Sequence, residues 1–143
     1  MRESAIMETV NSGGTPVTTV GTIDRGIYSC ITPDIQTDEV VITDERIGHI
    51  KEHHPGDYEK IAPFLKAALS DPDYILEDEA HRKNTGLILK KIELNGLRFR
   101  MVLRLHTSDD PEGYKNSIIS AWKISESRWN NYVNNKKVLY NRG

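Results

Sequence analysis

Three of the five histidines in the chain lie within six positions of one another, at His49, His53 and His54. Imidazole ionises near neutral pH and can therefore accept or donate a proton under ordinary conditions. Cleavage of RNA needs both actions, because a base must remove the ribose 2′-OH proton and an acid must protonate the leaving 5′ oxygen. The cluster indicates acid–base chemistry of this kind, although one histidine could instead cap a helix and another pack in the core.

A metal site is the alternative for the same residues. His49 and His53 are four positions apart, a spacing that could place two imidazoles on one ion, but the sequence has no His-Glu-x-x-His pattern. It also lacks a carboxylate cluster suited to two Mg²⁺ ions, which argues against two-metal cleavage of DNA. We therefore expect no metal and no cofactor.

Cations and hydroxyl groups that could stabilise the charge of a phosphoryl transition state flank the expected loop 107–116. They are Lys90, Arg104, Thr107, Lys115 and Ser117. Arginine suits phosphate because its planar group donates two parallel hydrogen bonds. Thr107 and Ser117 could equally be ordinary turn residues.

Residues 97–105 alternate in the manner of a strand. One side carries Leu97, Phe99, Met101, Leu103 and Leu105, and the other carries Arg98, Arg100, Arg104 and His106, with Val102 between them. The pattern predicts a core face and a cationic face that binds a polyanion. The alternative is a face that is simply solvated, as antiparallel sheets often have.

Trp122 and Trp129, with Tyr132, could stack nucleotide bases. Aromatic side chains of this size are more often part of a core. We expect a structural role for both tryptophans.

The remaining patterns predict the elements that position these residues. Residues 1–16 read as a flexible N-terminal arm, and 17–23 with 27–31 as a short hairpin. Helices are expected at 43–54 and 57–69, strands at 74–76, 87–93, 97–105 and 117–124, and a closing helix at 126–134. The fold class expected is α+β, with N-terminal helices packed on a four-stranded antiparallel sheet and a short C-terminal helix, in a single domain at 17–143.

Charge is distributed unevenly along the chain. Residues 1–80 hold 6 Lys/Arg and 16 Asp/Glu, whereas residues 81–143 hold 13 Lys/Arg and 5 Asp/Glu. The basic half could offer one side of the molecule to a polyanion. With a single cysteine, no run of signal-peptide length and no membrane-spanning run, a cytoplasmic protein is expected.

Three stretches of the chain resemble a known family. They are VVITDERIGHIKEHHPGDYEK, PDYILED and GYKNSIISAWKISESRWNNY, and they are similar to the phage-type nucleases of the barnase–EndoU–colicin–RelE (BECR) superfamily. The resemblance covers about residues 18–140. It implies the BECR, barnase-like fold, with helices followed by a four-stranded sheet, and a metal-independent ribonuclease of phages or mobile elements, sometimes acting as a toxin.

The resemblance also implies roles for particular residues. His49 and His54 match the two histidines of the family's helix motif, while His53 stands where an arginine is expected. Lys115, Ser117, Trp122 and Lys123 are similar to the strand motif. On an ideal helix, residues 49 and 54 lie about 140° apart, so both reach one bond only if the helix frays at Pro55.

The function expected is therefore an endoribonuclease that forms a 2′,3′-cyclic phosphate in the cytoplasm of a bacterial host. The expected catalytic residues are His49, His54, Arg104 and Thr107, and the expected substrate-binding residues are Lys90, Arg98, Arg100, His106, Lys115 and Ser117. The expected partners are single-stranded RNA or tRNA and an immunity or antitoxin protein, with no membrane. The alternatives are a non-catalytic RNA- or protein-binding module and a phage structural component.

Overall fold

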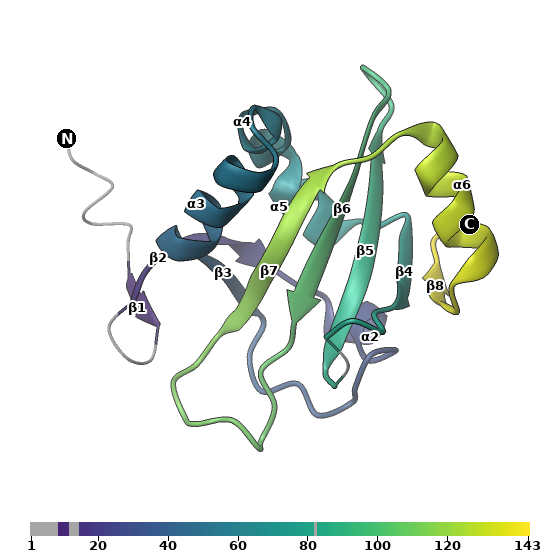
Figure 1. Cartoon of the computed structure of the whole chain (residues 1–143). Helices are drawn as coiled ribbons and strands as arrows, with labels where there is room; N and C mark the ends of the chain where they lie inside the picture. Colours follow the sequence, from purple (N-terminus) through teal and green to yellow (C-terminus); the bar gives the residue numbers. More distant parts are fainter. Residues whose placement is uncertain (1–8, 12–14, 82) are drawn as a thin grey trace.

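The computed structural model describes residues 9–11, 15–81 and 83–143, which are organised around one eight-stranded sheet (Figure 1). The strands are β1 (Thr9–Asn11), β2 (Thr15–Thr22), β3 (Glu39–Thr43), β4 (Tyr74–Glu77), β5 (Thr85–Ile92), β6 (Leu97–Arg104), β7 (Asn116–Lys123) and β8 (Val138–Asn141). Their order across the sheet is β1-β2-β3-β7-β6-β5-β4-β8. β3 and β7 run parallel, and the other neighbouring pairs are antiparallel.

Side-chain caps set the starts of the two longest helices. The helical segments are α2 (Arg25–Tyr28), α3 (Asp44–His53), α4 (Asp57–Ile61), the 3₁₀ turn η1 (Ala62–Phe64), α5 (Leu65–Ser70) and α6 (Glu126–Asn135). The Thr43 hydroxyl accepts a hydrogen bond from the backbone N–H of Arg46 at the start of α3. Ser125 does the same for Arg128 in α6. These bonds satisfy N–H groups that have no partner within the helix.

Both faces of the sheet are covered. On β6, Phe99 and Met101 face a core shared with residues of α3, α4 and α5, such as Ile50 and Ile61. Val102 points to the opposite face, in a smaller cluster against which Trp129 of α6 packs. Figure 1 shows α6 beside β4 and β8, apart from α3 and α4.

The expected four-stranded antiparallel sheet carrying N-terminal helices is wrong. The sheet has eight strands and mixed direction, and β2 and β3 precede α3 in the chain. β2 and β3 extend the sheet beyond β7, and β8 pairs with β4 at the other side. These pairings join segments far apart in the sequence, and local patterns do not specify them.

The hairpin expected at residues 17–31 is also wrong. β2 pairs with β3, and Asp24 begins a helix by accepting a hydrogen bond from the Gly26 N–H at 2.8 Å. Tyr28 at the end of that helix is fully buried, and its hydroxyl donates to the Leu69 carbonyl at 2.8 Å. Burial raises the pKa of the Tyr28 phenol, which keeps the donor proton in place. Aspartate is common both in tight turns and at helix N-caps, so the sequence Asp24-Arg25-Gly26 is compatible with a hairpin turn and with the start of a helix.

Residues 1–8 and 12–14 of the expected N-terminal arm lie outside the described residues. Thr9–Asn11 and the first residues of β2 pair with each other. Within the part of the chain that is described, no helix is both long and apolar enough to cross a bilayer.

The parallel pairing of β3 with β7 is short. Val40 pairs with Asn116 and Val41 with Ser117; β3 ends at Thr43, whereas β7 continues to Lys123. The chain leaves the sheet at Thr43 to form α3, and α3 and α4 contact β7 where β3 no longer does (Figure 1). The Lys123 N–H donates to the Asp57 carboxylate at 3.1 Å, which fixes the start of α4 at the end of β7.

We predict that Gly86→Ala lowers the free energy of unfolding by about 1–3 kcal/mol, measured by urea denaturation. A Cβ at this position of β5 would lie 2.4 Å from Ile31 Cδ1 and 3.3 Å from Ile75 Cγ2, so the core must shift. Gly48→Ala is the matched control. A Cβ there meets nothing within 4 Å, and alanine should stabilise α3 by up to about 1 kcal/mol. Equal effects of the two changes would contradict the prediction.

Candidate functional site

The end of α3 brings a histidine onto the end of β7. His54 is the C-cap of α3, with φ −136° and ψ 69°, and its backbone leaves the helix there. Its ring stacks on Trp122, with the ring centroids 4.2 Å apart and the planes 11° from parallel. This departure from the helix at Pro55-Gly56 is the fraying that would allow His49 and His54 to serve one site.

An arginine of the neighbouring strand lies over the same indole. Arg100 of β6 is directly opposite Trp122, and its guanidinium carbon is 4.1 Å from the indole centroid. One guanidinium nitrogen donates to the Tyr132 hydroxyl at 2.9 Å, while Nε is buried and has no hydrogen-bond partner. The contact is a cation–π interaction, and the positive charge of Arg100 is directed at an aromatic ring instead of a carboxylate.

Two pockets adjoin the stacked His54 and Trp122 rings, and both residues line each of them. One, of about 460 Å³, is also lined by Lys123, Ile124, Ser125, Arg128 and Tyr132. The other, of about 230 Å³, is also lined by His49, Ile50, His53 and Ser120. No carboxylate is among these lining residues, and Lys123 and Arg128 make the local potential of the larger pocket favourable for an anion.

The smaller pocket gathers groups that can exchange protons. The His49 and His53 rings are 4.2 Å apart by their centroids, and His53 Nδ1 hydrogen-bonds the His49 carbonyl at 3.1 Å. The Ser120 hydroxyl is buried and has no hydrogen-bond partner. A buried hydroxyl without a partner is costly, and this one belongs to a residue that lines the pocket. The exposed His49, Glu52 and His53 also offer ligand atoms within 4.8 Å of one another that could hold a metal ion.

The other expected catalytic residues lie elsewhere on the sheet. Arg104 is four residues from Arg100 along β6, a separation of about 13 Å. Its guanidinium binds both carboxylate oxygens of Asp110, at 2.8 and 3.4 Å. The Thr107 N–H donates to Asp110 at 2.9 Å, and Thr107 is buried. This arrangement holds the loop after β6 in place, and it neutralises the Arg104 charge.

His106 stands in the same loop region. It is buried, its ring is stacked on Tyr114 with centroids 6.1 Å apart, and its Nδ1 has no hydrogen-bond partner. The side chain of Asn116 accepts from the His106 N–H at 2.7 Å and donates to the Thr37 carbonyl at 2.8 Å. His106 is therefore separated from the helix histidines by most of the length of β7.

The remaining expected substrate-binding residues are mostly paired with acidic groups. Lys90 is buried, and its Nζ lies 2.6 Å from the Asp71 carbonyl. Arg98 lies 3.8 Å from Glu126 of α6. Lys115 forms an ion pair with Glu39, and Ser117 is opposite Arg104 in the strand register. Of the expected site residues, His49 and His54 line one pocket together with Trp122, which Arg100 contacts. Arg104, Thr107 and His106 gather instead around Asp110.

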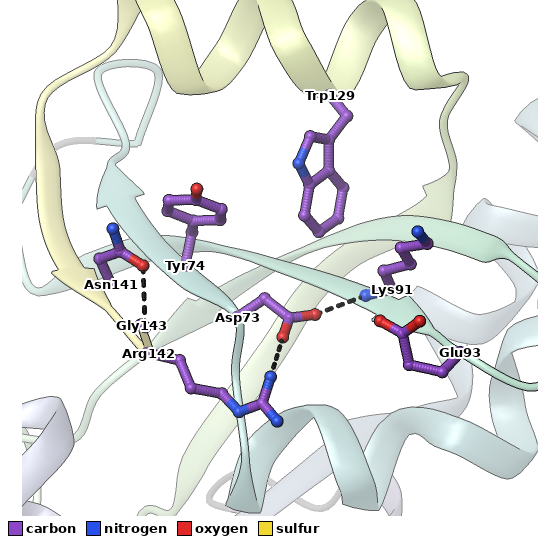
Figure 2. A pocket seen from close by; sticks show the side chains of 8 residues that line it. All are labelled: Asp73, Tyr74, Lys91, Glu93, Trp129, Asn141, Arg142 and Gly143. Atoms are coloured by element: carbon purple, nitrogen blue, oxygen red, sulfur yellow. Dashed lines mark hydrogen bonds and ion pairs between the residues drawn. The ribbon is translucent and has the colours of Figure 1, made fainter.

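A further pocket, of about 250 Å³, lies beside Trp129 and contains none of the expected site residues (Figure 2). Arg142 there pairs with Asp73 at 3.0 Å, and the Asp73 carboxylate also accepts from the Lys91 N–H at 2.7 Å. Trp129 packs edge-on against Tyr74. These contacts attach the C-terminal residues to the sheet.

Sequence reasoning did not single out Ser120 or Arg128. It considered Trp122 and Tyr132 as base-stacking residues but expected a structural role for Trp122. Trp122 is half-buried and stacks on His54. Side chains two residues apart on a strand share a face, so the sequence of β7 already places Ser120 beside Trp122. Arg128 and Tyr132 are one helical turn apart on α6.

The comparison with known proteins decides the family. A family model described as phage-Barnase-EndoU-ColicinE5/D-RelE like nuclease2 matches residues 17–141. The chain belongs to this family. It is thus a nuclease of the phage BECR type, as the resemblance implied. No match was found among curated proteins or among solved structures.

We predict that Asp110→Asn lowers the free energy of unfolding by about 1–2 kcal/mol at pH 7. Burial alone would raise the pKa of Asp110, but hydrogen bonds from Arg104 and Thr107 outweigh it and hold the pKa below its ordinary value. The stabilisation is complete above the unfolded pKa of about 3.9, and it is lost as the pH falls through the lower folded pKa.

Urea denaturation of both proteins between pH 7 and pH 2 measures this difference. Asp109→Asn is the control, because Asp109 is exposed and lies 3.6 Å from an exposed Lys83. Such a surface pair contributes little. A difference for Asp110→Asn that stays constant down to pH 2 would contradict the assigned role.

Proposed function

We propose that the chain is an endoribonuclease whose active centre is the His54–Trp122 site, formed by His49, His54, Arg100, Ser120, Trp122 and Tyr132. Nuclease membership comes from the family; the RNA substrate, the mechanism and the residues are our proposal. The observation that carries it is the His54–Trp122 stack, which two carboxylate-free pockets share.

The arrangement suits an RNA strand that lies across both pockets, with the scissile phosphodiester bond between them. His54 and Arg100 both lie within 4.2 Å of the centre of the Trp122 ring and occupy its two faces. A base in the larger pocket would therefore contact the edge of this stack and the Tyr132 ring, where aromatic contact tolerates any base. Lys123 and Arg128 in the larger pocket hold the phosphates. Arg100, directly behind the indole, adds positive charge where the phosphoryl oxygens become more negative.

The reaction proposed is attack of the ribose 2′ oxygen on the adjacent phosphorus. One of the two imidazoles, His49 or His54, accepts the 2′-OH proton as the new P–O bond forms. The other donates a proton to the 5′ oxygen as the old P–O bond breaks. The products are a 2′,3′-cyclic phosphate and a free 5′-OH, and the imidazoles together neither gain nor lose protons.

The proposed substrate is single-stranded RNA or tRNA. Binding of an immunity or antitoxin protein, a role as a toxin and a place in the bacterial cytoplasm stay predictions from the family resemblance.

The direct test is cleavage of labelled single-stranded RNA in excess EDTA. We expect a cyclic phosphate product, and a loss of about 10²–10⁴-fold in kcat/KM for His54→Ala and for His49→Ala, since each removes one proton-transfer group. His81→Ala is the matched control, because His81 pairs with Asp78 away from this site. Folded wild-type protein that binds RNA without cleaving it would replace the proposal with the RNA-binding module.

A second test compares two arginines on the same strand. Arg100→Lys keeps the charge but loses the flat stacking surface and the fork of donors, so RNA affinity should fall about tenfold. Arg104→Lys should change RNA affinity less than twofold and should lower thermal stability instead, because Arg104 holds Asp110. Fluorescence anisotropy with labelled RNA measures both. The reverse ranking would move the site to the Arg104 end of the sheet.

A further inference from the structure

We propose that His49, Glu52 and His53 form a binding site for a zinc-class transition-metal dication, and that the bound ion inhibits the nuclease. The inhibition rests on the proposed function, whereas the metal site itself does not. Three features of α3 carry the inference: the spacing of the ligands, the tautomer of His53 and the position on the helix.

The spacing brings the three donors together. Positions 49, 52 and 53 are i, i+3 and i+4 on α3, so they lie on one side of the helix. Their ligand atoms are all within 4.8 Å of one another. Donors on a tetrahedral Zn²⁺, with bonds of about 2.0–2.1 Å, stand about 3.3 Å apart. All three side chains are exposed, so small side-chain rotations can bring the ligand atoms to the spacing that Zn²⁺ requires.

The hydrogen bond of His53 prepares it as a ligand. A carbonyl oxygen can only accept, so the 3.1 Å contact between His53 Nδ1 and the His49 carbonyl places the proton on Nδ1. Nε2 then keeps its lone pair and is free to bind a metal. Metal-binding histidines in proteins are oriented in this way, with the second ring nitrogen bonded to a carbonyl or carboxylate.

The site lies in the last turns of α3, next to carbonyl groups that carry the negative end of the helix dipole, which favours a cation. The neighbouring Lys51 pairs with Glu59 at 3.7 Å and not with Glu52, which leaves the Glu52 carboxylate available to a metal ion. Two imidazoles and one carboxylate, with a water completing the tetrahedron, are a donor set that proteins use for zinc. Mg²⁺ prefers oxygen ligands and should bind poorly.

The consequence for catalysis follows from the overlap at His49. The smaller pocket is lined by His49 and His53 beside His54. An imidazole whose lone pair is bound to a metal cannot accept the 2′-OH proton. The ion would also lie beside the pocket that we assign to one side of the scissile bond, because His49 and His53 line that pocket.

Calorimetric titration of the full chain, carrying no polyhistidine tag, with Zn²⁺ tests the site. We expect one ion per chain, affinity at least tenfold weaker in His53→Ala and in Glu52→Gln, and no comparable binding of Mg²⁺. His81→Ala is the matched control and should bind as wild type, since His81 has a single carboxylate partner, Asp78. Wild-type affinity in His53→Ala, or no zinc binding by the wild type, would overturn the metal site.

Cleavage assays without chelator test the inhibition. Zn²⁺ should slow the wild type, and Glu52→Gln should need at least tenfold more Zn²⁺ for the same effect, with its metal-free rate unchanged. Zinc that binds to the wild type without slowing cleavage would overturn the inhibition. Failure of the folded wild type to cleave RNA in EDTA would instead reject the ribonuclease proposal, and the titration would still decide the metal site.

Discussion

The short parallel pairing between β3 and β7 is the constraint on which the site depends. After Val41 pairs with Ser117, β3 ends at Thr43 and the chain turns into α3, while β7 continues to Lys123 paired with β6. A longer β3 would have covered the edge of β7 with backbone. Instead, the helix returns along this edge and its last turn places His54 against Trp122. The sheet thus supplies a rigid support, and the end of the helix supplies the histidines of the proposed active centre.

The helix α6 and the loop after β6 determine which arginine of β6 is not paired with a carboxylate. The three arginines follow the same alternation, but Arg98 reaches Glu126 and Arg104 binds Asp110. Arg100 lies between them, against Trp122 and the Tyr132 hydroxyl. A guanidinium stacked on aromatic rings keeps its charge and its free donors, whereas one bound to a carboxylate is neutralised. The position of the proposed anion-binding region therefore rests on the pairing partners of the cations more than on their number, in a protein of formal net charge −2.

Local patterns in the sequence predicted much of the local structure. The core face of β6 and the caps Thr43 and Ser125 follow from alternation and capping rules. The extent and direction of the sheet did not, because the pairing of β2, β3 and β8 depends on contacts between distant segments. For the same reason Arg100 and Arg104 could not be told apart: their neighbours come from β7, α6 and the loop after β6. A structural role was expected for Trp122, and the sequence alone does not show that β3 ends before it and leaves it half-buried.

The amide of Asn116 ties the base of the loop 107–115 to the segment just before β3. Its oxygen holds the His106 N–H, and its nitrogen holds the Thr37 carbonyl. Both ends of the loop are therefore joined by one side chain, and the cost of closing a longer loop rises only slowly with length. A change in the length of this loop should therefore leave the strands in place, and it would lie most of the length of β7 away from the helix histidines.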